Sequence, residues 1–442
     1  MTIKSENRAW MRPFFTIWGG QAVSTFGSSI VQFALIWHLA EQTNSATVLA
    51  FASIVSALPY IFVAPWAGAL VDRWNRKRVM ILSDGSIALL SLVLLLLFYT
   101  NHVRPWHIFA IMFMRSVGGV FQWPAMAASV PLMVPENQLG RIGGMNQTLQ
   151  GALMIVAPPV AAFLLTFMPL WSIMAVDVST ALIGIIPLAI TAIPQPPVRF
   201  GPGDIQSKVG SIKNDIRIGL RYVLRWPGLR TVMLLGGLVY FIMSPTVSLG
   251  PILVRNYFHG GAKDLGFVQC AMGIGIFIGG VVLSIWGGTR KKVYTVAGGL
   301  VGVGIGTLII GFSPPHLLNL AVAGAFIAGL MVSVANAPLT AIIQSSVDLR
   351  VQGRVLTVFN SLISVISPLG LVIAGPLSDI FGVHVWYIIA GLGTLSLGLL
   401  AFLLRSVQNL EEEGRKHREA MARIDFRPVS RETEKDEFGE GS

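Results

Sequence analysis

Acidic side chains inside long apolar segments are the first residues of this 442-residue sequence that could do chemistry. Asp177 lies deep in the apolar run 170–193, while Asp84 and Glu41 lie nearer the ends of two other runs. In an apolar medium a carboxyl group titrates closer to neutral pH than in water, as a proton carrier must. These three residues are therefore our candidates for proton coupling.

Each of these carboxylates also has a simpler interpretation. Asp177 is either a proton carrier or cation anchor, or a structural carboxylate satisfied by neighbouring hydroxyl groups or a water-filled cavity. For Asp84, pairing with arginines in the preceding loop is the simpler interpretation. Glu41 lies at an outer end where solvation suffices, although at a cavity mouth it could attract cationic drugs. Arg115, the one Lys or Arg deep inside an apolar run, either pairs with a carboxylate or extends to an interface.

A second set consists of polar residues deep in apolar runs. The simplest interpretation of each residue alone is that it forms a hydrogen bond between helices. As a set they predict a partly polar cavity in an apolar wall, as ligand sites usually are. The candidates for this substrate path are Gln21, Gln32, Gln122, Asn146, Gln147, Tyr240, Gln269, Asn336 and Asn360.

Composition and cysteine content exclude several other chemistries. One cysteine, Cys270, excludes an internal disulfide framework and a cysteine-based zinc site. There is no nucleotide-binding lysine loop, so ATP is not expected to drive this protein. Hydrophobic residues make up 53% and charged residues 12%, whereas soluble domains carry roughly 25% charged residues. We therefore expect neither a soluble nor a disordered protein, and no enzyme, cofactor or metal site.

Long apolar runs must position these residues. A membrane-spanning helix needs about 20 consecutive, mostly apolar residues. The sequence predicts an all-α membrane protein with 12 transmembrane helices in two pseudo-symmetric six-helix halves. Kinks are expected at prolines such as Pro59 and Pro65. The runs are 14–40, 46–71, 79–99, 107–134, 143–167, 170–193, 229–254, 265–288, 293–312, 317–343, 355–378 and 383–404.

The longest connection between runs divides the chain in two. Helical periodicity with basic residues at 211–226 predicts an amphipathic helix on the inner leaflet. The expected parts are an N-terminal tail (1–12), an N-terminal bundle (13–193), a central loop (194–228), a C-terminal bundle (229–404) and a charged tail (405–442).

The placement of basic residues predicts the orientation. With the N-terminus in the cytoplasm, 28 of the 32 Lys and Arg residues fall on the cytoplasmic side and three on the other, and Arg115 lies within a span. This is the positive-inside pattern, so both termini are predicted to be cytoplasmic. The basic residues lie in short loops and not on a soluble module, which disfavours nucleic-acid binding. No cleavable signal peptide is expected.

An internal repeat relates the two halves. The turn R-K-R-V at 76–79 maps onto R-K-K-V at 290–293, and Pro124 maps onto Pro338 at the same offset. Such a duplication in parallel topology is typical of transporters, in which the substrate path runs between the halves.

The segment 68–78 reads G-A-L-V-D-R-W-N-R-K-R. It resembles the loop 2–3 signature of the major facilitator superfamily, G-x-L-x-D-R-x-G-R-K/R-K/R. Asn75 stands where glycine is usual, and asparagine tolerates the left-handed backbone that glycine supplies. The resemblance implies a cytoplasmic gate between the halves, formed by Gly68, Asp72, Arg73, Arg76 and Lys77. The alternative is that these charges only set the topology.

Within that superfamily, stretches 17–21, 26–29, 32–37, 45–50 and 67–76 resemble the macrolide efflux pumps. The span-four signature R-x-x-x-G is matched from Arg115, and the resemblance implies that this arginine takes part in proton transfer. The span-five signature of exporters, G-x-x-x-G-P-x-x-G-G, is matched in part. Here the proline is kept and small alanines replace glycines.

The resemblance implies a secondary active exporter of amphipathic small molecules such as macrolide antibiotics, exchanged for protons by alternating access. Siderophore or lysophospholipid export is an alternative on the same fold, and a non-transporting sensor or scaffold is an alternative of another class. We expect a monomer in the inner (cytoplasmic) membrane, with lipid, protons and a small-molecule substrate as partners.

Overall fold

The computed structural model describes residues 10–71, 74–195, 217, 220–224, 226–347 and 349–410, and all regular structure within them is helical. The predicted helix at 211–226 lies largely outside these residues, as does the tail beyond 410. The N-terminal half contains α2 (Met11–Thr43), α3 (Ala46–Phe62), α4 (Ala64–Val71), α5 (Arg76–Tyr99), α6 (Pro105–Met133), the short 3-10 helix η1 (Glu136–Gln138), α7 (Leu139–Phe167) and α8 (Leu170–Ile190). The C-terminal half contains α10 (Pro227–Ser248), α11 (Gly250–Ile252), the π-helix η2 (Leu253–Tyr257), α12 (Ala262–Trp286), α13 (Lys292–Phe312), α14 (Leu318–Ser346), α15 (Leu349–Phe381), α16 (Val383–Leu403) and the short α17 (Arg405–Gln408).

Ten of the described helices are long and apolar enough to cross a membrane. The other two predicted spans correspond to α3 with α4, and to α6. Helix α6 has 29 residues but carries Arg115, Gln122 and, beyond its first residue, two prolines, which make it less apolar. The all-helical membrane fold is therefore confirmed, while the count of twelve spans stays a prediction.

The run 46–71 forms two helices because prolines interrupt its backbone hydrogen bonding. The Ser45 side chain begins α3 by accepting a hydrogen bond from the Val48 N–H. Helix α3 ends at Phe62, three residues after Pro59, and Pro65 is the second residue of α4. Proline lacks the N–H that a continuous helix needs, so the chain bends at this predicted kink.

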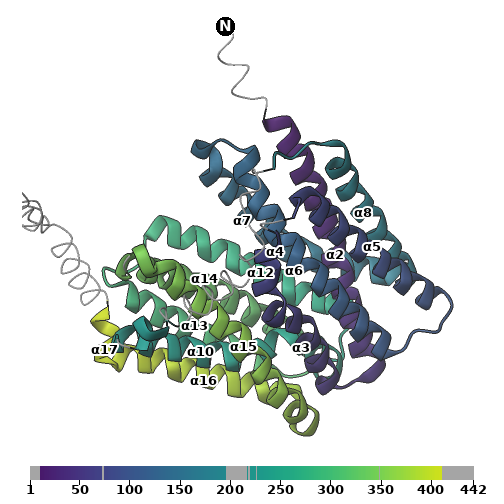
Figure 1. The fold of residues 1–442 in the computed structure, drawn as a ribbon. Coiled ribbons are helices and arrows are strands. Elements are labelled where there is room, and N and C mark those ends of the chain that lie inside the picture. Colours follow the sequence, from purple (N-terminus) through teal and green to yellow (C-terminus); the bar gives the residue numbers. More distant parts are fainter. Residues whose placement is uncertain are drawn as a thin grey trace, which may run out of the picture.

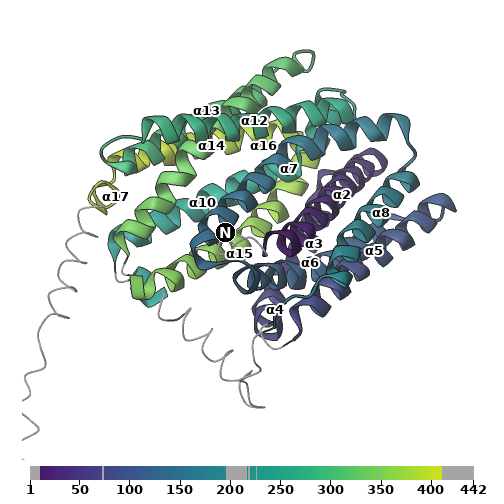
Figure 2. The ribbon, with the colours of Figure 1, turned by 90° about the horizontal axis from the view of Figure 1, so that it is seen from above.

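The helices gather into two bundles, the purple-to-blue N-terminal half and the green-to-yellow C-terminal half of Figure 1. Across the halves, α3 packs on α15 and α7 packs on α12 (Figure 2). Each contact joins the second span of one half to the fifth span of the other. Two repeats related by an approximate two-fold axis must make such a reciprocal pair of contacts, in agreement with the repeat in the sequence.

Close contact between these helices depends on small residues. A Cβ added to Gly266 of α12 would lie 3.0 Å from the Ala162 Cβ of α7, and one added to Gly375 of α15 would lie 3.0 Å from the Ala50 Cβ of α3. One of the alanines that replace glycines in span five, Ala162, is thus matched by a glycine on the facing helix. Small-residue interfaces let membrane helices approach closely, because no hydrophobic effect drives their association within lipid.

Two adjacent glycines of α12 allow this packing to be tested. A Cβ on Gly279 would overlap the Leu330 carbonyl oxygen of α14, whereas a Cβ on Gly280 meets nothing within 4 Å. We expect Gly279→Ile to lower the unfolding free energy by roughly 1–3 kcal/mol, as overpacking does. Thermal unfolding in detergent, followed by tryptophan fluorescence, measures the loss. The matched variant Gly280→Ile should unfold like the wild type, and equal effects of the two variants would contradict this packing.

Candidate functional site

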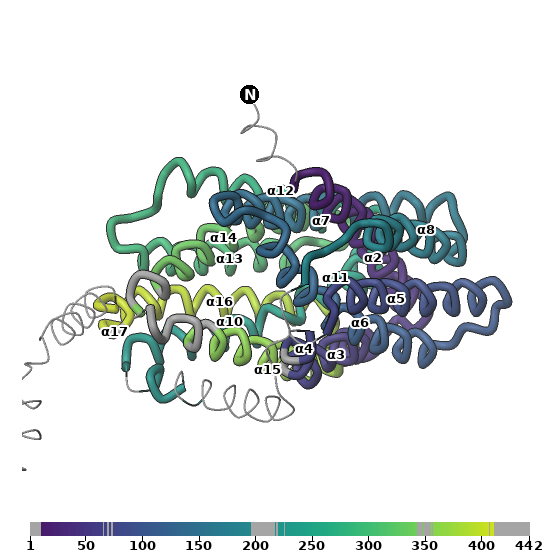
Figure 3. Tube along the Cα trace, turned by 45° about the horizontal axis from the view of Figure 1, so that its top comes forward, coloured from purple at the N-terminus to yellow at the C-terminus, as the bar shows by residue number. Residues whose placement is uncertain are grey.

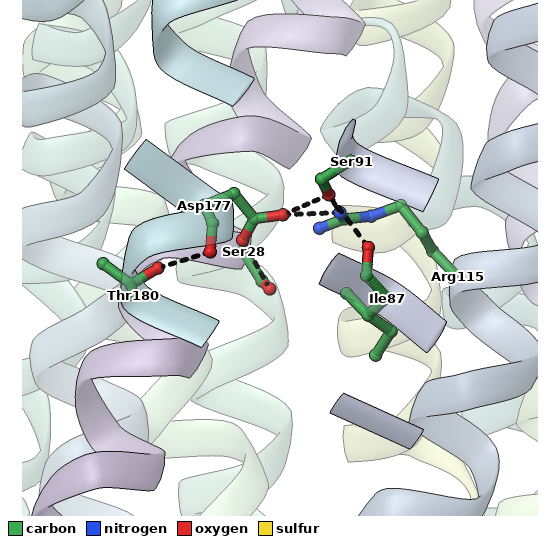
Figure 4. Close-up of polar contacts among 6 residues, drawn as sticks. All are labelled: Ser28, Ile87, Ser91, Arg115, Asp177 and Thr180. Atoms are coloured by element: carbon green, nitrogen blue, oxygen red, sulfur yellow. Dashed lines mark hydrogen bonds and ion pairs between the residues drawn. The ribbon is translucent and has the colours of Figure 1, made fainter. Parts of the chain in front are cut away.

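A buried ion pair lies at the centre of the N-terminal half (Figure 4). The Arg115 Nη1 atom of α6 lies 2.5 Å from the Asp177 Oδ2 atom of α8, and the two side chains are 10% and 1% exposed. The Ser91 hydroxyl of α5 donates to the same carboxylate oxygen at 2.5 Å, and Arg115 also donates to that hydroxyl. The Ser28 hydroxyl of α2 donates to the other oxygen, Oδ1, at 3.0 Å. Both oxygens of this carboxylate are therefore occupied.

The pair and its two serines join four helices, α2, α5, α6 and α8. Burying two charges costs several kcal/mol per ion, and the cost is met only with good geometry and further hydrogen bonds. The serines supply these bonds, so removal of either charged partner would leave the other uncompensated.

Small residues let α2 approach α8 closely enough for Ser28 to reach Asp177. A Cβ added to Gly27 would overlap the Thr180 side chain of α8, and Gly20 of α2 faces Gly184 of α8. Thr180 donates to the Asp177 carbonyl at 3.0 Å, which satisfies its own hydroxyl inside the bundle. Figure 3 shows α2 and α8 side by side along the N-terminal half.

A second buried carboxylate, Asp84 of α5, lies in an amide network. The Gln21 Nε2 atom donates to the Asp84 Oδ2 atom at 2.7 Å, and the Gln122 amide donates to the Gln21 side-chain oxygen. Asp84 and Gln21 are each 5% exposed. Among the described residues, Asp84 has no ion-pair partner. The predicted pairing with loop arginines is not formed by Arg76, whose guanidinium binds elsewhere.

The loop expected to form the cytoplasmic gate is described in part. Asp72 and Arg73 lie outside the described residues, and Gly68 lies in α4. The Arg76 guanidinium donates to the Ala128 carbonyl of α6 at 2.9 Å. The Lys77 ammonium donates to the Ala189 carbonyl of α8 at 2.8 Å. Both basic residues thus hold the ends of helices in their own half, where cations are favoured by the helix dipole.

Asn75 does not occupy the left-handed conformation that the sequence comparison with glycine suggested. Its φ is −65° and its ψ is 109°. Its side-chain oxygen instead accepts a hydrogen bond from the Arg78 N–H at 3.1 Å and so begins α5. The expectation was wrong because asparagine is favoured equally at helix N-termini, where an extended backbone is needed.

A cavity of about 870 Å³ lies between the halves. Four of the nine predicted substrate-path residues line it: Gln32, Tyr240, Gln269 and Asn336. The other five do not line it. Gln21 and Gln122 belong to the network of Asp84, and Asn146 accepts the Trp18 indole N–H at 2.7 Å. Gln147 and Asn360 are exposed but lie outside the lining. The polar lining residues that the sequence reasoning missed are Thr25, Ser28, Ser29, Gln150, Thr246, Thr307 and Tyr387.

The spacing of polar residues in the sequence could have predicted part of this lining. Thr25, Ser28, Ser29 and Gln32 lie three or four residues apart and so share one face of α2. Ser28 belongs to this face and also donates to Asp177. It therefore connects the cavity to the buried ion pair.

The end of the molecule predicted to be outer joins the two halves through polar contacts. The Asp379 carboxylate of α15 accepts hydrogen bonds from the Ala46 and Thr47 N–H groups at the start of α3, at 2.6 and 3.0 Å. Arg255 of η2 lies 3.3 Å from Glu41 and donates to Asn44 at 2.9 Å. Glu41 is thus an exposed partner in this contact and lies apart from the buried carboxylates. An acidic group is favoured at a helix N-terminus, where N–H groups are free.

Comparison with known proteins adds relatives and a fold. A family profile described as Major Facilitator Superfamily matches residues 17–365 and 232–435. Macrolide efflux protein A of Streptococcus pyogenes is 33% identical over 403 residues, covering 91% of this chain and 98% of that protein. The multidrug efflux pump Tap of Mycolicibacterium fortuitum is 25% identical over 400 residues, covering 87% and 94%. A solved bacterial homolog of the human lysosomal transporter Spinster, inward-facing and unoccupied, has a TM-score of 0.67 at 12% identity, covering 92% and 98%, and shows the likeness of fold.

The contact at the outer end yields a prediction. In Asp379→Asn the charge at the start of α3 is lost, so we expect the outer ends of the halves to separate more often. Spin labels at the exposed positions His102 and Lys263, one in each half, would report a larger population at long distance. Asp264→Asn is the matched control, because Asp264 bonds only the Gly261 N–H of its own half. Identical distance distributions in Asp379→Asn and the wild type would contradict the role of this contact.

Proposed function

Because the chain belongs to the major facilitator superfamily of membrane transporters, we propose that it is a proton-coupled exporter of amphipathic small molecules of the macrolide type. The observation that carries this proposal is the position of Ser28, which lines the central cavity and donates to the buried carboxylate of Asp177. A change in the protonation of Asp177 therefore acts directly on the wall of the substrate cavity. The inner membrane, with both termini in the cytoplasm, is the proposed location, since this orientation puts 28 of the 32 Lys and Arg residues on the cytoplasmic side.

The substrate class is supported by the relatives and by the cavity. The macrolide efflux relative covers nearly all of this chain at more than 30% identity. The cavity volume of about 870 Å³ falls within the range of roughly 300–1,000 Å³ that drug-sized ligands occupy. Its wall is mostly apolar with a few amides and hydroxyls, which suits a large molecule with both apolar and polar surface.

In alternating access, the contacts between the halves would open at one end of the molecule and close at the other. The contact of α7 with α12 includes Ile155, Pro158 and Ala162, whereas a Cβ at Gly143 or Gly151 of α7 meets nothing within 4 Å. The described contacts between α7 and α12 thus lie toward the predicted outer end. We propose that this is the conformation that admits substrate from the cytoplasm. Return would require the outer contacts to open and the gate of Gly68, Asp72, Arg73, Arg76 and Lys77 to join the halves.

Proton coupling would proceed through the buried ion pair. A proton bound by Asp177 neutralises its carboxylate and leaves Arg115 without a counter-charge in an apolar environment, which is costly. The pair must then rearrange, and Ser28 transmits the change to α2 and the cavity. Release of the proton restores the pair. Asp84, in its amide network, is the second candidate for this role, and Glu41 is the third.

The charge of Asp177 can be removed with little change of shape. Asp177→Asn keeps a side chain that can bond to Ser28 and Ser91. We expect transport of radiolabelled erythromycin, driven by a pH gradient across inside-out vesicles, to fall below about a tenth of the wild-type rate, since a hydrogen bond to a charged group is worth about 1.5–3 kcal/mol. Exchange of labelled for unlabelled drug without a gradient should persist, because this step needs no proton.

Other results of this assay assign the function differently. Gradient-driven movement retained in Asp177→Asn would move coupling to Asp84 or Glu41. If correctly inserted wild type moves no erythromycin, the macrolide assignment fails, and labelled siderophores and lysophospholipids are the next substrates to test. No movement of any of them would favour a sensor or scaffold.

The link through Ser28 makes a separate prediction. Ser28→Ala removes the hydrogen bond between the cavity wall and Asp177, so we expect gradient-driven transport to slow by about tenfold, the effect of losing roughly 1.4 kcal/mol. Ser179→Ala is the matched control, because Ser179 lies two residues from Asp177, faces outward and bonds only its own helix. Equal rates in Ser28→Ala and Ser179→Ala would exclude Ser28 as the link.

A further inference from the structure

The central cavity is large but carries no formal charge. None of the described residues that line it is Asp, Glu, Lys, Arg or His. Its polar groups are the amides and hydroxyls of Thr25, Ser28, Ser29, Gln32, Gln150, Tyr240, Thr246, Gln269, Thr307, Asn336 and Tyr387. A ligand in this cavity finds hydrogen-bond partners for neutral polar groups and no counter-charge for an ionised one.

The charged groups nearest to this wall are compensated or shielded. Asp177 is 1% exposed and is paired with Arg115, so together they present no net charge to the cavity. Asp84 is 5% exposed and is bonded by Gln21, and neither residue belongs to the lining. Arg255 follows two lining residues but is itself bound to Glu41 and Asn44.

Aromatic rings offer little replacement for a counter-charge. Four aromatic residues line the cavity. Phe33 and Phe258 are 7% exposed and Tyr387 is 6% exposed, because their rings are packed against other side chains. Tyr240 alone among the four is half-buried. A cation needs an accessible ring face within about 6 Å, and one ring provides a weak site at most.

From these observations we infer that the cavity binds its ligand in the uncharged form and discriminates against permanent cations. Moving an ion from water into a largely apolar site without a partner costs far more than moving a neutral group that finds hydrogen bonds. An amine substrate would accordingly be carried as the free base. This inference deepens the proposed function, because it takes the cavity ligand to be the transported substrate.

The test uses two pairs of compounds that differ in charge. One pair is a single macrolide in which the dimethylamino nitrogen is either methylated to a quaternary ammonium or demethylated and acetylated to a neutral amide. The other is tetraphenylphosphonium and triphenylphosphine oxide, which does not depend on the macrolide assignment. Equilibrium binding to the purified full-length protein is measured for all four. We expect each neutral member to bind at least about tenfold more tightly than its cationic counterpart.

A carboxylate placed in the wall should weaken this preference. Gln32→Glu introduces one on the cavity face of α2, and Asn336→Asp introduces one from α14 in the other half. We expect either variant to raise the affinity for both cations by about tenfold, as a desolvated counter-charge does. Gln138→Glu, in η1 and outside the lining, is the matched control and should keep the wild-type ratio.

The outcomes separate this inference from the proposed function. Cations that bind the wild type as tightly as their neutral partners would overturn the inference, and so would failure of both neutral compounds to bind. If the neutral compounds bind with the expected preference but a pH gradient does not move them, the proposed function fails and the charge discrimination stands.

Discussion

The buried pair of Asp177 and Arg115 is the interaction on which the N-terminal half depends. Two opposite charges in the middle of an apolar bundle are tolerable only if they touch and if their remaining hydrogen-bonding capacity is used. Serines on α2 and α5 provide this, and glycines on α2 and α8 bring the backbones close enough for them to do so. The same requirement that fixes the pair thus fixes the spacing of four helices.

The contacts between the halves follow a different rule. Where α7 meets α12 and α3 meets α15, the surfaces are built from small residues whose backbones approach closely. Such contacts depend on close packing of backbones and not on buried charges. Polar bonds are added at the predicted outer end, around Asp379 and Arg255. The N-terminal half is therefore held around its ion pair, while its junction with the other half is held by packing and by these polar bonds at one end.

Sequence alone predicted the helices, the repeat and the two members of the ion pair, but not their pairing. Arg115 and Asp177 lie 62 residues apart, and helices apolar on every side give no periodic signal for which faces meet. Gln21 and Gln122 were assigned to the substrate path for the same reason, although they belong to the network of Asp84. Ser and Thr on the cavity face of α2 were missed because such residues commonly bond their own helix backbone, so their presence in a span does not indicate a ligand site. Asn75 shows a further limit, since a residue type that suits two backbone conformations does not choose between them.

The described cavity wall carries no charge, whereas Asp84, Arg115 and Asp177 all lie in the N-terminal half. The described spans of the C-terminal half carry acidic residues only near their ends, at Asp264 and Asp379. Substitutions on α10, α12 and α14 can therefore reshape their part of the wall without touching these three buried groups. Under the proposed mechanism such a division makes substrate range evolvable: under a new drug, selection can alter the C-terminal part of the wall and leave the ion pair of the N-terminal half intact.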